Sequence, residues 1–255
     1  MAEDPTARFR LDDRVALVTG ASSGIGRSLV SALAGAGARV VMSARRVERL
    51  EELAASLPGS VALHCDVTRD SDLEALVAGT MERCGRIDIL VNNAGITEVT
   101  PAETEPAELF RSVVAVNLTA PFLLSKLVAG HMLEAGRGSI VNIVSVLGLR
   151  GVGQIPQAGY AASKGGLVNL TRELAAQWAR RGIRVNAIAP AWFPTEMTDE
   201  MFADEGARRW IRRRTPMGRP GELDELDGAL LFLASDASTY VTGQILPVDG
   251  GWTAV

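Results

Sequence analysis

Tyr160 and Lys164 are the residues of this chain whose types and spacing best suit acid–base chemistry. In a helix, a spacing of four residues puts both side chains on one face, about one turn apart. An unperturbed tyrosine has a pKa of about 10 and an unperturbed lysine one of about 10.4. A neighbouring ammonium favours the phenolate, so we expect Lys164 to lower the pKa of Tyr160. The pair would then act as a general acid or base near neutral pH.

Taken alone, this pattern is also common on the surface of amphipathic helices, so its neighbours in the sequence matter. Ser145 ends an apolar run, residues 138–145, that predicts a buried strand. The residues that follow, 146–156, are rich in glycine and predict a loop before the helix at 157–181. We therefore expect strand and helix to bring Ser145 toward Tyr160 and Lys164.

A glycine-rich turn follows the first predicted strand, residues 14–20. It reads Gly20-Ala-Ser-Ser-Gly24-Ile-Gly26 and precedes a predicted helix at 27–36. Glycines let the backbone approach a pyrophosphate, and a helix N-terminus offers free N–H groups to it. The order of strand, turn and helix thus favours a phosphate-binding turn, with a purely structural turn as the alternative.

The end of the second predicted strand, residues 38–43, bears on the choice of nucleotide. An acidic residue there would hold the ribose 2′-hydroxyl of NAD, but this chain continues with Ala44-Arg45-Arg46. Arginine can give charge-assisted hydrogen bonds to a 2′-phosphate. We therefore predict that NADP(H) is preferred over NAD(H). The alternative is that two solvated arginines merely precede the helix at 47–56.

Strands and helices alternate along the whole sequence. The remaining predicted strands are 61–65, 87–92, 183–189 and 244–248, and the remaining helices are 71–84, 101–135 and 221–235. The alternation predicts a single α/β domain over residues 1–255, with a seven-stranded parallel sheet, helices on both faces and an insertion at about 190–220. Asn117 is a poor helix former, so we expect a local distortion within 101–135.

Composition and charge exclude several classes of protein. The net charge of −4 does not favour nucleic-acid binding. Residues 1–14 are charged and do not resemble a signal peptide, and no run of about 18 apolar residues predicts a membrane span. The two cysteines and two histidines have neither disulfide-framework nor metal-ligand spacing, so we expect no metal site and buried free thiols in a reducing cytoplasm.

Together these motifs resemble the short-chain dehydrogenase/reductase family over residues 11–252. The matching positions are Thr19-Gly-x-x-x-Gly-Ile-Gly26, Asp66-Val67, Asn92-Asn-Ala-Gly95, Asn117, Ser145, Tyr160-x-x-x-Lys164 and Pro190. Ala191 is a departure, since the family usually has glycine there. The resemblance implies a Rossmann fold, an NAD(P) cofactor, hydride transfer to or from a carbonyl carbon, and a homotetramer.

The resemblance also implies roles for individual residues. Ser145 would donate to the substrate carbonyl, Tyr160 would transfer the proton, Lys164 would bind the nicotinamide ribose, and Asn117 would hold a water beside Lys164. The expected cofactor contacts are Gly20, Ser22, Ser23, Gly24, Ile25, Gly26, Arg45, Arg46, Asp66, Val67, Asn93, Ala94, Gly95, Tyr160, Lys164, Pro190, Phe193 and Thr195. The expected substrate contacts are Ser145, Leu147, Ile155, Gln157, Tyr160 and Trp192.

The implied function is that of an NADPH-dependent ketone reductase, or alcohol dehydrogenase, acting on a small molecule. One alternative is an NAD-dependent dehydrogenase of a sugar acid or secondary alcohol. A second is a dinucleotide-binding regulator without catalysis, against which all four catalytic positions argue. The arginines between Arg208 and Arg214 could meet an anionic substrate or form a solvated helix face.

Overall fold

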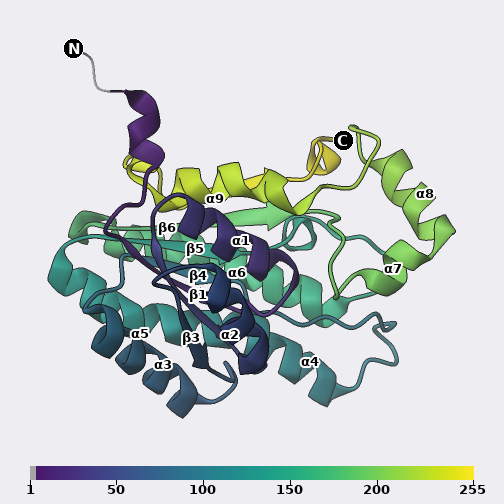
Figure 1. The fold of residues 1–255 in the computed structure, drawn as a ribbon. Coiled ribbons are helices and arrows are strands. Elements are labelled where there is room, and N and C mark those ends of the chain that lie inside the picture. Colours follow the sequence, from purple (N-terminus) through teal and green to yellow (C-terminus); the bar gives the residue numbers. More distant parts are fainter. Residues whose placement is uncertain (1–3) are drawn as a thin grey trace.

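The architecture is a seven-stranded parallel sheet in the order β3-β2-β1-β4-β5-β6-β7 (Figure 1). A computed structural model describes residues 4–255 of the chain. Residues 1–3, part of the charged segment 1–14, lie outside the described residues. The strands are β1 Val15–Thr19, β2 Arg39–Ala44, β3 Val61–His64, β4 Ile89–Asn92, β5 Gly138–Ile143, β6 Ile183–Pro190 and β7 Ile245–Val248. The predicted fold class is confirmed, and each strand begins and ends within two residues of its prediction.

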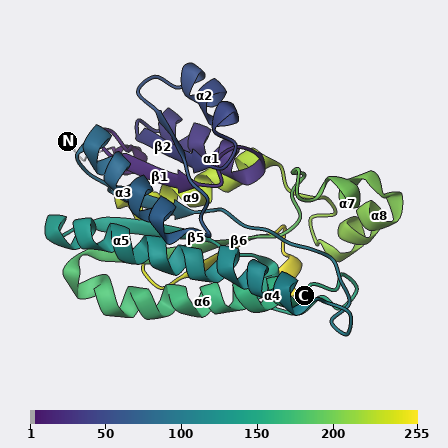
Figure 2. The ribbon, with the colours of Figure 1, turned by 90° about the horizontal axis from the view of Figure 1, so that it is seen from below.

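Helices cover both faces of the sheet. One face carries α1 Gly24–Gly35, α2 Val47–Ser56 and α9 Asp227–Ala234. The other carries α3 Asp70–Cys84, α5 Ala120–Ala135 and α6 Ala158–Trp178, which lie along the sheet in Figure 2. The short helices α7 Asp199–Ala203 and α8 Glu205–Arg214 come from the predicted insertion and project beyond the sheet.

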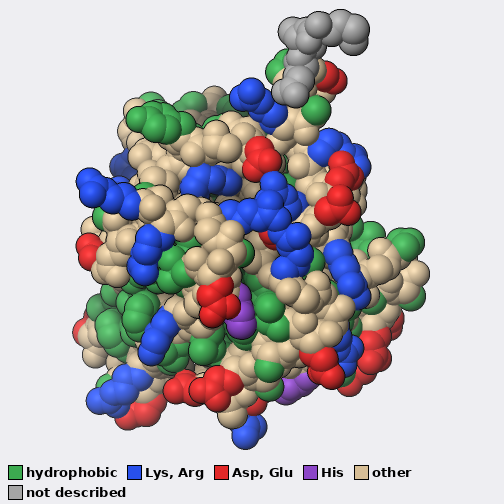
Figure 3. Space-filling view, turned by 90° about the vertical axis from the view of Figure 1, so that its left-hand side faces the viewer, with side chains coloured by type: hydrophobic (Ala, Val, Ile, Leu, Met, Phe, Trp, Pro, Cys, Tyr) green, Lys and Arg blue, Asp and Glu red, His purple; other side chains and the backbone are tan. Residues whose placement is uncertain are grey.

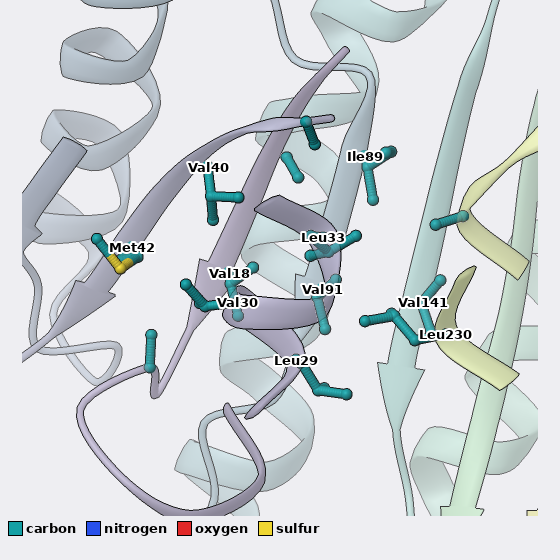
Figure 4. Packing of buried hydrophobic residues seen from close by; sticks show 14 of the residues in the cluster. Val18, Leu29, Val30, Leu33, Val40, Met42, Ile89, Val91, Val141 and Leu230 are labelled. Carbon is teal, nitrogen blue, oxygen red and sulfur yellow. The ribbon is translucent and has the colours of Figure 1, made fainter. Parts of the chain in front are cut away.

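Each face of the sheet has its own apolar core, because every central strand is buried on both sides. Under α1 and α9, the side chains of Val18, Val91 and Val141 meet Leu29 and Leu230 (Figure 4). Packing in these cores fixes the positions of the strand ends, and the side chains of the candidate site lie at those ends.

The long helical region differs from its prediction in two ways. It begins with α4, Ala107–Val114, so residues 101–106 form turns rather than helix. A π-helical turn, Ala115–Thr119, then joins α4 to α5, and it contains Asn117. The expected distortion at Asn117 is therefore confirmed.

The continuous helix from Ala107 to Ala135 is also long and apolar enough to cross a membrane by length and composition, with a mean hydropathy of 1.6. The sequence analysis did not predict this, because the segment contains no unbroken apolar run. Half of its most apolar window is buried inside the protein, and the helix packs against α3 and α6. These contacts are those of a core helix in an α/β fold.

Candidate active site

The predicted cofactor contacts and Ser145 meet at the carboxyl edge of the sheet, around a cavity of about 490 Å³. The sheet order reverses between β1 and β4, and ligands of doubly wound sheets bind at such a point. Every residue predicted to contact the cofactor lines this cavity. The cavity is also lined by residues that were not predicted as cofactor contacts, namely Ala44, Cys65, Thr68, Ile96, Ser112, Val116, Ile143, Val144, Ala191, Glu196, Met197 and Thr198.

The glycine turn forms one end of the cavity and requires glycine for two different reasons. Gly20 and Gly24 have φ of 66° and 53°, a region that other residues rarely adopt. At Gly26 an added Cβ would overlap the carbonyl oxygen of Gly20 and Nδ2 of Asn93. The turn is therefore packed as tightly as its backbone allows.

Hydrogen bonds from β1 and β4 hold this turn in place. The hydroxyl of Thr19 accepts bonds from the backbone N–H groups of Asn93 and Ala94, both at 3.1 Å. In return, the Asn93 amide donates to the carbonyls of Thr19 and Gly20 at 3.0 and 3.1 Å.

The N-terminus of α1 opens beside the glycine turn, because Ser23 and Gly24 both line the cavity. No side chain of residues 4–255 caps it, and its first turn contains no acidic residue. Its N–H groups and the positive end of the helix dipole are thus available to an anion. Together with the glycine turn, this donor set fits the pyrophosphate of a dinucleotide.

Ser145, Tyr160 and Lys164 form the other end of the cavity. Ser145 caps a short 3₁₀ helix, Val146–Gly148, by accepting a 3.2 Å bond from the backbone N–H of Leu147. An added Cβ at Gly148 would lie 2.7 Å from the backbone of Lys164. This close approach brings Ser145 against α6, as its position in the sequence predicted.

Burial dominates the electrostatics of the tyrosine and the lysine. It raises the pKa of Tyr160, with the Ser145 hydroxyl acting in the opposite direction. It lowers the pKa of Lys164 to about 8. The expectation that Lys164 lowers the pKa of Tyr160 was wrong for this arrangement, because the ammonium bonds the Ile143 carbonyl at 2.8 Å and lies 5.6 Å from the centre of the tyrosine ring. At neutral pH Tyr160 is a protonated phenol, which suits a proton donor.

Asn117 lies behind the cavity rather than on its wall. Its side chain is fully buried and bonds both backbone groups of Ile96 at 2.9 Å and the Ser163 hydroxyl at 3.1 Å. The side chain therefore fixes the loop after β4 to α6. The water expected beside Lys164 stays a prediction.

The two arginines after β2 differ in their contacts. Among residues 4–255, Arg45 makes no side-chain hydrogen bond and no ion pair within 4.0 Å. Arg46 donates to the hydroxyls of Ser22 and Ser23, at 3.2 and 2.9 Å through Nη2, and to Glu196 at 2.9 Å. Glu196 also accepts from Arg49, and these arginines lower its pKa to about 2. The sequence analysis missed Glu196 and Arg49.

The predicted substrate residues Leu147, Ile155 and Trp192 pack in an apolar cluster that includes Tyr160 but do not line the 490 Å³ cavity. Trp192 makes edge-to-face contacts with Trp210 and Trp252, at 5.4 and 6.0 Å between ring centres. The structure thus places an apolar wall beside the tyrosine.

The predicted substrate residue Gln157 and the arginine cluster of α8 are both already paired within the protein. Gln157 accepts a 2.6 Å bond from the Thr97 hydroxyl at the start of α6. In α8, Glu205 forms ion pairs with Arg208, Arg209 and Arg212, which favours the solvated-face interpretation of that cluster.

The thiol at the cavity does not suit a nucleophile. Cys65 lines the cavity, but burial raises its pKa to about 12. Cys84 is also free and is half-buried rather than buried as expected.

Comparison with known proteins agrees with this geometry. The family model described as Enoyl-(Acyl carrier protein) reductase matches residues 20–253. The chain is 43% identical over 253 residues to a gluconate 5-dehydrogenase of Gluconobacter oxydans, covering 96% of each chain. It is 41% identical over 247 residues to a 3-oxoacyl-[acyl-carrier-protein] reductase of Thermotoga maritima, covering 95% of this chain and 99% of the relative.

Among solved structures, a gluconate 5-dehydrogenase from Burkholderia cenocepacia in complex with NADP and tartrate superposes with a TM-score of 0.94. It is 41% identical, and the match covers 99% of this chain and 100% of that one. These matches span nearly the whole chain and agree with the motifs at Gly20, Ser145 and Tyr160. The chain therefore belongs to the short-chain dehydrogenase/reductase family and is an oxidoreductase acting on CH–OH or C=O groups.

Proposed function

We propose that this protein is an NADPH-dependent ketone reductase, working in reverse as an alcohol dehydrogenase, with Tyr160 as its general acid and base. The convergence of Ser145, Tyr160 and Lys164 on one cavity, opposite an uncapped helix N-terminus, carries this proposal. When bound, the nicotinamide supplies or accepts the hydride. The chain's own residues bind the cofactor, orient the substrate and transfer the proton.

In this proposal the hydroxyl of Ser145 donates a hydrogen bond to the substrate carbonyl oxygen. The phenol of Tyr160 gives its proton to the same oxygen and takes it back in the oxidation direction. A positioned acid of this kind contributes roughly 10²–10⁴-fold to a rate. Lys164, on the same face of α6, binds the nicotinamide ribose.

Preference for NADP(H) is supported by the residues after β2. Ala44 is a buried alanine where a carboxylate would repel a 2′-phosphate, and Arg45, Arg46, Ser22 and Ser23 surround the cavity at that end. We expect Ala44→Asp with Arg45→Ile to reverse the preference. The measurement is the ratio of kcat/KM with NADPH to that with NADH. A wild type that uses NADH equally well would refute the preference and support the NAD-dependent alternative.

For the substrate, we infer a sugar acid of the gluconate type, because relatives named for gluconate match nearly the full chain. The test is a panel assay of NADPH oxidation with 5-keto-D-gluconate, an acetoacetyl thioester and a cyclic diketone. We expect the highest kcat/KM for 5-keto-D-gluconate. The thioester as best substrate would assign the protein to acyl chemistry, and no turnover of any ketone would support a silent regulator.

We further propose that the protein is a homotetramer. The exposed faces of α4 and α5 carry Phe110 and Phe122, each about 40% exposed. Of the small residues on α6, Gly166 already packs against Leu118 of the same chain, whereas Ala162 is exposed. Light scattering at micromolar concentration should give about four times 27.0 kDa, and a monomer would contradict the proposal.

A further inference from the structure

Glu196 places a carboxylate across the nucleotide end of the cavity, on a segment distant in sequence from the glycine turn. It belongs to a turn closed by a 2.9 Å bond from the backbone N–H of Thr198 to the carbonyl of Thr195. The Thr198 hydroxyl fixes this turn by donating to the Phe193 carbonyl at 2.7 Å. An added Cβ at Gly24 would come within 3.2 Å of Thr195. The turn therefore rests directly on the start of α1.

The carboxylate of Glu196 bridges two guanidinium groups. One oxygen accepts from Arg46 at 2.9 Å and the other accepts from Arg49. All three side chains are nearly half exposed, at 45% for each arginine and 49% for the glutamate. Ion pairs this exposed are weak, so one of them can be exchanged for another at little cost.

Arg46 is the shared partner. Its guanidinium also donates to the hydroxyls of Ser22 and Ser23, which holds it at the end of β2. In a doubly wound sheet that is where the adenosine ribose and its 2′-substituent bind. A 2′-phosphate and the Glu196 carboxylate would therefore seek the same guanidinium, and two like charges oppose each other there.

We propose that Glu196 sets the strength of nucleotide discrimination by competing with the 2′-phosphate for Arg46. This inference rests on the proposed cofactor function. When the 2′-phosphate takes Arg46, Glu196 keeps its bond to Arg49, which remains as an alternative partner. When the nucleotide has only a 2′-hydroxyl, Glu196 keeps both arginines. Arg46 favours the nucleotide that carries a 2′-phosphate. Glu196 makes this preference smaller than Arg46 alone would give.

The test uses adenosine 2′,5′-bisphosphate and adenosine 5′-monophosphate, which differ by the 2′-phosphate and do not require catalysis. Titration calorimetry gives the Kd of each for the full-length protein. In Glu196→Gln, we expect the preference for the bisphosphate to rise about two- to fivefold, as the loss of an exposed ion pair allows. The Kd for the monophosphate should stay within twofold, whereas a merely structural change would move both values together.

Two further variants sharpen the test. Arg49→Ala leaves Glu196 only Arg46, so it should weaken bisphosphate binding in the wild type but much less in the Glu196→Gln background. Glu205→Gln is the matched control, because Glu205 is an exposed carboxylate that bonds Arg208 at 2.9 Å outside the cavity. We expect it to leave both Kd values unchanged.

The outcomes separate the inference from the proposed function. If the wild type prefers the bisphosphate and Glu196→Gln keeps or lowers that preference, the role of Glu196 is wrong and the cofactor assignment stands. If the wild type binds the two nucleotides equally, both the role of Glu196 and the proposed NADP(H) preference through Arg46 are wrong.

Discussion

The two edges of the parallel sheet carry cavities of similar size and opposite chemistry. The carboxyl edge has the site cavity of about 490 Å³, and the amino edge has one of about 510 Å³. Helices of an α/β fold begin at the first edge and end at the second. The carboxyl edge therefore offers free N–H groups and the amino edge offers carbonyl groups.

Arginines at the amino edge satisfy those carbonyls and one buried acid. Arg184 donates to the carbonyls of Leu233 and Ser235, at 2.9 and 3.0 Å, where α9 ends. The carboxylate of Asp88, 5% exposed, accepts from Arg86 at 2.6 Å and from the backbone N–H of Val15 at 2.9 Å. Figure 3 shows this face, where basic and acidic side chains lie interspersed.

The comparison teaches that cavity size alone does not identify a site. At the amino edge the charged groups face one another and their hydrogen bonds are made within the chain. At the carboxyl edge the α1 N-terminus is uncapped and a phenol and an ammonium share one wall. Changes at the amino edge should therefore affect stability, and changes at the carboxyl edge should affect binding and turnover.

The largest stability effect is expected for Asp88→Ala. Removing this buried carboxylate takes an acceptor away from Arg86, which is 40% exposed, and from the backbone N–H of Val15. A lost hydrogen bond to a charged group contributes roughly 1.5–3 kcal/mol and an unsatisfied buried N–H roughly 1–3 kcal/mol, so we expect a loss of about 3 kcal/mol. Urea unfolding measures the loss, and kcat/KM of the folded fraction should not change. The control is Asp236→Ala, since the Asp236 side chain is 65% exposed and its pair with Arg14 should contribute at most about 1 kcal/mol. Equal losses in the two variants would contradict the distinction.

A smaller stability loss is expected for Gly26→Ala at the carboxyl edge. The added methyl group overlaps the Gly20 carbonyl and the Asn93 amide, so overpacking should cost about 1–3 kcal/mol and weaken dinucleotide binding at least tenfold. Gly35→Ala in the same helix is the control, because its Cβ would meet nothing within 4 Å. If the Gly26 variant bound NADPH as tightly as the Gly35 variant, the glycine turn would not hold the phosphates.

The last stability effect is a pH dependence that arises from Lys164. Its pKa is about 8 in the folded protein and 10.5 in the reference state, so between these values the unfolded chain binds more protons. The stability of the wild type relative to Lys164→Met should therefore rise with pH from about 8 to about 10.5, by at most about 1.4 kcal/mol per pH unit. Paired urea titrations measure the difference. A difference that falls over this range would contradict the burial of the ammonium.

The sequence predicted the features that depend on local pattern. Short apolar runs gave the strands, and the glycines between them located the turn at Gly20 because only glycine tolerates its backbone and packing. The poor helix propensity of Asn117 located the π-helical turn. Tyr160, Lys164 and Ser145 were brought together by the predicted order of strand, loop and helix.

Features that depend on burial or on distant segments could not be predicted in this way. The pKa of Tyr160 is raised because the fold desolvates its partly buried side chain, and no spacing in the sequence reports desolvation. Glu196 and Arg46 are 150 positions apart in the sequence, so the residues around the end of β2 could not predict that a carboxylate lies beside the arginines. Likewise, the hydrogen bonds of Asn117 to Ile96 and Ser163 arise only from the folded loop.

The central claim is that Tyr160 at the carboxyl edge transfers the proton in an NADPH-dependent reduction. The most direct test measures NADPH oxidation with 5-keto-D-gluconate for the wild type and Tyr160→Phe, together with the Kd of NADPH for each. Phenylalanine keeps the ring and removes only the hydroxyl. We predict that kcat/KM falls about 10²–10⁴-fold while the Kd for NADPH stays within about threefold. Near-normal turnover in Tyr160→Phe would contradict the claim.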